Sequence, residues 1–87
     1  MNITEVCNAF DMSVERFARL IGYRRPTLYN GIHWTPKARR AIDTLRRVSA
    51  EMYERDKAEA KVKYEAREDA INSFIDQIKP HRRKKDG

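Results

Sequence analysis

Polar side chains that can recognise the edges of nucleic-acid bases lie close together in one short stretch of this chain. An arginine can pair with guanine through two hydrogen bonds, and an asparagine can do the same with adenine. Threonine and tyrosine can place a hydroxyl on a phosphate or carbon atoms on a thymine methyl group. The side chains of this kind are Arg24, Arg25, Thr27, Tyr29, Asn30 and His33.

Two short helices joined by a turn would have to present these side chains together. The sequence predicts helices over 14–21 and 25–33, in a helix–turn–helix arrangement. The small Ala18 lets the helices cross closely, and Gly22 can adopt the positive φ of the turn. Leu28 points the apolar face of the second helix back at the first. The outer face of the helix over 25–33 is then a surface suited to the DNA major groove.

The segment resembles known DNA-binding proteins at several of these positions. In AxxxGYRRPTLYNGIH it resembles the helix–turn–helix of the phage Cro and repressor group, most closely at Ala18, Gly22, Leu28, Gly31, Ile32 and His33. The following WTPKARRAI is similar to the segment after the recognition helix in phage CII-type activators. The resemblance covers about residues 13–45 and implies a phage or mobile-element regulator. The helical C-terminal half departs from Cro, which ends in β structure.

The resemblance implies which side chains would contact DNA. Base contacts are expected from Arg24, Arg25, Thr27, Tyr29, Asn30 and His33. Independently of the resemblance, Lys37, Arg39 and Arg40 are expected to contact phosphates from their place in the first turns of the next helix. The alternatives are solvated surface arginines and lysines and a Tyr29 ring packed back on the domain. Trp34 is expected to be a core or hinge residue.

The remaining signals place two more helical regions. Asn2 and Glu5 predict a capping box for a first helix, and Thr35 followed by Pro36 predicts the start of a long one. No glycine or proline follows until Pro80, and most residues between favour helix.

The long helix would carry two apolar stripes. The first should close the N-terminal core, and the second is too far along a straight helix to reach that core. The helix must therefore break and fold back, or the second stripe must meet another chain. Self-association is the favoured interpretation, and its expected residues are Ile71, Phe74, Ile75 and Ile78.

These elements predict an all-α fold, with a three-helix domain followed by a long helix or a broken helix pair. The expected organisation is a DNA-binding domain over 1–50, a helical extension over 51–79 and a disordered basic tail over 80–87.

Composition narrows the classes of function. The net charge of +6 is concentrated around the second motif helix, the start of the long helix and the tail, which favours a nucleic-acid partner. No run of residues is apolar enough to span a membrane, and no signal peptide is recognisable. The single cysteine, Cys7, is expected to be a core thiol in a reducing cytoplasm, in a bacterial cell or phage-infected host. No residue spacing indicates a metal site, a cofactor or an enzyme.

The sequence thus favours a sequence-specific transcriptional regulator that binds a palindromic operator in double-stranded DNA as a homodimer. Two alternatives remain. One is a DNA-recognition subunit of a larger assembly, similar to phage small terminase subunits, and the other is a small protein that binds or inhibits a protein partner through its long helix.

Overall fold

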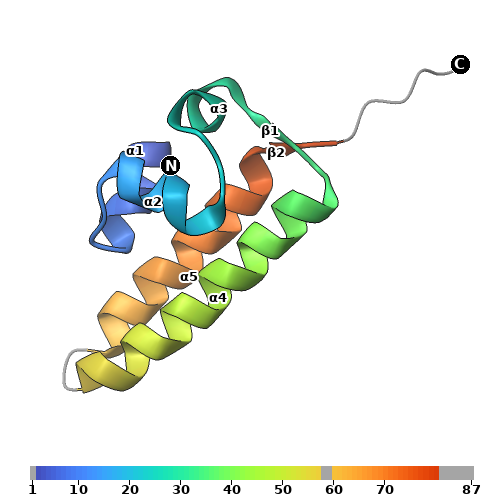
Figure 1. The fold of residues 1–87 in the computed structure, drawn as a ribbon. Coiled ribbons are helices and arrows are strands. Elements are labelled where there is room, and N and C mark those ends of the chain that lie inside the picture. Colours follow the sequence, from blue (N-terminus) through green and yellow to red (C-terminus); the bar gives the residue numbers. More distant parts are fainter. Residues whose placement is uncertain (1, 58–59, 81–87) are drawn as a thin grey trace, which may run out of the picture.

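The computed structural model describes residues 2–57 and 60–80, which form helices and one very short parallel strand pair. The elements are α1 (Ile3–Ala9), α2 (Val14–Ile21), α3 (Arg25–Asn30), β1 (Ile32–His33), α4 (Pro36–Asp56), α5 (Ala60–Gln77) and β2 (Ile78–Lys79). Helices α4 and α5 lie side by side and antiparallel, and the short helices gather towards one end of this pair (Figure 1). The predicted all-α class is confirmed, with the long helical region as a broken pair. None of the described helices is both long and apolar enough to cross a membrane.

The helix starts are those that the capping residues predict. Asn2 and Glu5 exchange two hydrogen bonds of 3.0 Å, which complete the capping box of α1. Ser13 caps α2 by accepting from the backbone N–H of Arg16 at 3.2 Å. Thr35 caps α4 in the same way, at 3.1 Å from the backbone nitrogen of Ala38. Each bond satisfies a backbone donor that the first helical turn leaves unpaired.

The turn between α2 and α3 has the geometry that its residue types predict. Gly22 ends α2 with φ of 82°, where a side chain would strain the backbone. Its N–H bonds back to the carbonyls of Ala18 and Arg19. Ala18 is buried in α2 and Leu28 is buried in α3, so the inner faces of both helices are apolar.

Helix α3 ends earlier than the sequence predicts, at Asn30 instead of His33. Gly31 stops it by adopting φ of 106° and ψ of 145°, which is incompatible with a helix. The next two residues are extended as β1 and pair with β2, with Ile32 beside Ile78 and His33 beside Lys79. The helix gives way because this pairing satisfies backbone groups of both segments.

One apolar core joins the N-terminal helices to both long helices. Phe10 from the end of α1, Phe17 from α2 and Phe74 from α5 form a chain of ring contacts. The ring centroids are 5.9 Å apart between Phe10 and Phe17, and 6.2 Å apart between Phe17 and Phe74. Helix α5 also lies against α1 and α4. The C-terminal helix is therefore part of the core that supports α2 and α3.

The expectation of self-association through the second apolar stripe is corrected by this packing. Ile71 is fully buried and Phe74 is 2% exposed, both within the core of their own chain. Ile75 and Ile78 are half-buried against the same core. The chain reverses between α4 and α5, which brings the stripe back to α1 instead of leaving it for a second chain.

The expected division of the chain differs from the observed packing. Residue 50 lies within α4, and the segment expected as an extension over 51–79 contributes α5 to the shared core. Of the tail expected over 80–87, all but Pro80 lies outside the described residues.

Candidate nucleic-acid interface

Helix α3 presents most of the expected base-contacting side chains on its outer surface. Leu28 is 6% exposed and faces the core. Arg24 precedes the helix in an extended conformation, and Arg25 is its first residue; both are exposed. Tyr29 and Asn30 are exposed at its C-terminal end. These four side chains therefore flank the two ends of one short helix.

Thr27 and His33 take different positions from these four exposed residues. Thr27 is half-buried, and its carbonyl accepts the N–H of Gly31 at 3.0 Å. His33 is exposed, but it belongs to β1 and not to α3. The expected set is thus split between a helix and the strand beyond it.

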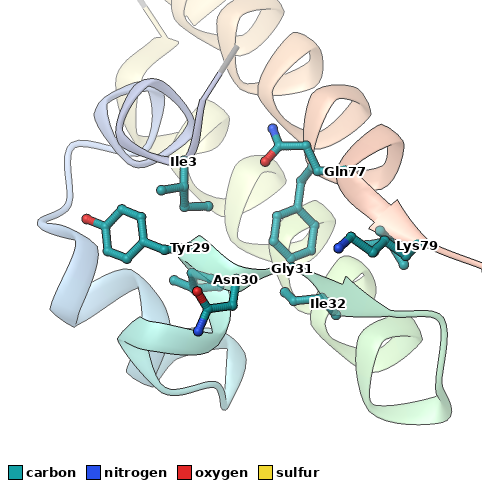
Figure 2. A pocket seen from close by; sticks show the side chains of 10 residues that line it. Ile3, Tyr29, Asn30, Gly31, Ile32, Gln77 and Lys79 are labelled. Atoms are coloured by element: carbon teal, nitrogen blue, oxygen red, sulfur yellow. The ribbon is translucent and has the colours of Figure 1, made fainter.

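Tyr29 lies at the edge of a cleft between α1, α3 and the end of α5. The cleft has a volume of about 270 Å³, and Leu28 and Phe74 contribute to its apolar lining. Figure 2 shows the Tyr29 ring on the side of Ile3, with Asn30 pointing away from α1. Tyr29 is 58% exposed, so it is available to a ligand although it borders the cleft.

Lys37, an expected phosphate contact, lies against the turn between α2 and α3. Its Nζ is 4.7 Å from the centroid of the Tyr23 ring, a cation–π contact that joins the first turn of α4 to the α2–α3 turn. The Lys37 side chain remains exposed. The contact therefore brings a positive charge beside Arg24, one residue after Tyr23.

Arg39 and Arg40 are exposed on α4 but lie on different sides of it. Successive residues of a helix are about 100° apart, so Arg40 lies about 60° from Lys37 and Arg39 about 160° from it. Lys37 and Arg40 can therefore face one phosphate backbone together, whereas Arg39 points to the other side of α4.

Two residues beside α3 were not anticipated as contacts from the sequence. Lys79 is exposed in β2 and is brought next to His33 by the strand pairing. Trp34 is 45% exposed, not a core residue, and its backbone N–H donates to the carbonyl of Lys79 at 2.8 Å. The only sequence signal was the alternation of Ile78 and Lys79 before a proline, which is too short to predict a strand.

The described residues offer donors and cations at this surface but no cluster of metal-ligating side chains. Across 2–57 and 60–80, no three His, Cys, Asp or Glu side chains are grouped so that they could hold a metal ion. Comparison with protein-family models, with curated proteins and with solved structures finds no match to this chain. Its function must therefore be inferred from the geometry and charge of the chain itself.

Proposed function

We propose that this protein binds duplex DNA through α3 in the major groove and regulates transcription at specific sites. The observation that carries the proposal is that α3 is held in the core by Leu28 and exposes polar side chains at both of its ends. Leu28 is anchored in the core, while Arg25 at the start of α3 and Asn30 at its end are both exposed. Arginine and asparagine are the side chains that read guanine and adenine through paired hydrogen bonds.

The charge around α3 supports the same proposal. Between Arg24 and Arg40 the sequence contains five arginines and lysines and no aspartate or glutamate. Lys37 is held at the α2–α3 turn by Tyr23, and Arg40 lies on the same side of α4 as Lys37. Cations around a recognition element orient a protein on the phosphate backbone and add affinity that does not depend on sequence.

We infer that two copies act together on a two-fold symmetric site. Helix α3 has 6 residues, and one such element buries too little surface for tight and specific binding. Helix–turn–helix dimers place their recognition helices about one turn of DNA apart, or a multiple of it. The dimer surface must be other than Ile71 and Phe74, because both are covered within one chain.

The decisive experiment is selection of bound duplexes from a random DNA pool at about 150 mM salt, where purely electrostatic binding is weak. A palindromic motif with a fixed spacing between half-sites is the expected result. Absence of any enriched motif, with binding that vanishes as salt rises, would contradict specific recognition.

A protein-binding function is the second candidate, and one feature favours it. The far end of the α4–α5 pair exposes Tyr53 and Val62, at 41% and 76%. Tyr53 also contacts the ring of Tyr64, with centroids 4.8 Å apart. A partner that covers this end would bind with little dependence on salt, and its binding would not change when Arg25 is replaced by alanine.

A further inference from the structure

The C-terminal strand β2 brings a lysine to the end of α3. Lys79 pairs with His33 in the parallel register of β1 and β2, and its carbonyl accepts the N–H of Trp34 at 2.8 Å. These backbone contacts tie residue 79 to the segment directly after α3. Its position relative to α3 is therefore set by the fold and not by the local sequence.

The Lys79 side chain extends back to Gly31, the residue that directly follows α3. A Cβ added to Gly31 would lie 2.9 Å from Cε and 3.0 Å from Nζ of Lys79. Figure 2 shows the Lys79 ammonium directed towards Gly31, with Asn30 adjacent along the chain. The absence of a side chain at Gly31 thus leaves the space that the lysine occupies.

The Lys79 ammonium also lies at the C-terminal end of α3, where a positive charge interacts favourably with the helix. The carbonyls at the end of a helix carry partial negative charge, which repels phosphates and is offset by a nearby cation. Within residues 2–57 and 60–80, no carboxylate lies within ion-pairing distance of Lys79. The exposed Lys79 places its charge beside Gly31, the residue that follows Asn30.

We propose that Lys79 is a phosphate-contacting residue of the DNA interface, next to the base pairs that α3 contacts. This inference rests on the proposed function, because it takes the DNA to lie along α3. It extends the interface to a residue that is separated from Asn30 in the sequence by the whole of α4 and α5. The packing of α5 on α1 and α4 then positions a DNA contact as well as stabilising the core.

The test compares two lysine variants of the full chain that change the charge equally. Lys79→Gln removes the proposed contact, while Lys61→Gln removes an exposed lysine from the first turn of α5, at the opposite end of that helix. Affinity is measured by fluorescence anisotropy on a mixed-sequence duplex about three helical turns long, between about 50 and 200 mM salt. Thermal unfolding of each variant verifies that the fold is unchanged.

For Lys79→Gln we expect a several-fold loss of affinity at low salt and a salt slope shallower by about 0.9, the value for one lost phosphate contact. Lys61→Gln should match the parent, and Lys79→Arg should retain the parent slope. Equal slopes for Lys79→Gln, Lys61→Gln and the parent would overturn the inference.

Failure of this inference can be told apart from failure of the proposed function. If Arg25→Ala weakens binding to the selected duplex while Lys79→Gln does not, DNA recognition by α3 stands and the Lys79 contact is wrong. If the random pool gives no motif but Lys79→Gln still lowers the salt slope, Lys79 contacts phosphates and sequence-specific regulation is wrong.

Discussion

At the scale of single residues, the two ends of α3 carry different recognition chemistry. Arg25 begins the helix with a forked donor suited to guanine, and Asn30 ends it with an amide that both donates and accepts. The residues between them are Pro26, Thr27, Leu28 and Tyr29, of which Leu28 is committed to the core. In the proposed interface, specific readout would depend on a small number of side chains.

Replacing Asn30 or Arg25 by alanine should cost about 1–3 kcal/mol on the selected duplex and relax the preference at one base pair of each half-site. The lost hydrogen bonds are those that distinguish the correct base from the others. Competition binding with single-base-pair variants of the duplex measures both effects.

Matched controls exist for each of these substitutions. Asn72→Ala and Arg55→Ala change the same residue types at exposed positions on α5 and α4. Both should bind as the parent does. If Asn30→Ala and Arg25→Ala also bind every duplex as the parent does, neither residue reads bases.

Cys7 is a residue whose reactivity the fold suppresses. It is 1% exposed, and burial raises the pKa of its thiol from 9.0 to about 11. Because the thiolate is the reactive form, about a hundredfold less of it is present in the folded than in the unfolded protein at about pH 8. Alkylation by iodoacetamide, followed by mass spectrometry, should therefore be slow until denaturant is added. Equal rates in the folded and unfolded protein would contradict this burial.

Because of the same pKa shift, the free energy of unfolding should fall at high pH. The folded state favours the neutral thiol. The contribution of Cys7 to the free energy of unfolding is therefore fully present below the ordinary pKa of the thiol. It is lost progressively as the pH rises from 9.0 towards about 11.

At the scale of elements, the interface between α4 and α5 contains buried polar residues as well as apolar ones. Arg67 of α5 is fully buried, and its Nη2 lies 3.4 Å from Oδ2 of Asp56 in α4. Ser49 of α4 is buried as well. In the described part of the chain, the Ser49 hydroxyl and the Nε and Nη1 atoms of Arg67 have no hydrogen-bond partner. A buried charge with one long ion pair is costly, and removal of that partner should raise the cost further.

Asp56→Ala should therefore lower the free energy of unfolding by about 3 kcal/mol, because it leaves the Arg67 charge buried without a partner. Arg67→Met should be much less harmful, since methionine fills the buried space and the partly exposed Asp56 carboxylate stays hydrated. Urea denaturation of both single variants and the double variant measures the coupling between them. A larger loss for Arg67→Met than for Asp56→Ala would contradict this account of the buried arginine.

At the scale of the whole molecule, α5 closes the core that supports the candidate interface. Phe74 contacts Phe17 of α2, the helix that precedes the turn to α3. The strand pair formed after α5 holds the segment beyond α3. Loss of the α5 packing should therefore affect both the stability of the fold and the position of α3.

Phe74→Ala should lower the free energy of unfolding by about 3–5 kcal/mol, because it leaves a cavity beside Phe17. Phe74→Leu, which keeps most of the volume, should cost about 1 kcal/mol and remain folded. Val62→Ala, at a position 76% exposed, is the control and should have almost no effect. Denaturant unfolding followed by circular dichroism gives these values. If Phe74→Leu instead lowers the oligomer mass at unchanged stability, the stripe contacts a second chain.

Local features of this protein could be predicted from its amino-acid sequence alone. Asn2, Ser13 and Thr35 identify helix starts, because a cap depends only on residues within one turn. Gly22 identifies the turn between α2 and α3, because few other residues adopt its φ without strain. These signals were sufficient to predict the all-α class and the four exposed residues at the two ends of α3.

The position of α5, and the contacts that depend on it, are properties of the tertiary structure. The seam of α4 runs through Leu45, Met52 and Asp56, and its continuation on a straight helix leads to the exposed Lys63. Helix α5 instead buries Ala60 and Arg67, so the apolar phase shifts where the chain reverses. Local propensity favours helix on both sides of the reversal and cannot tell a straight helix from a folded pair.

The early end of α3, the strand pair and the placement of Lys79 beside Gly31 all depend on contacts between segments far apart in sequence. Such contacts form only when the free energy gained by burying α5 outweighs the entropy lost in bringing together segments so far apart in the chain. That balance is decided by the whole chain, so no local pattern of residues could predict it.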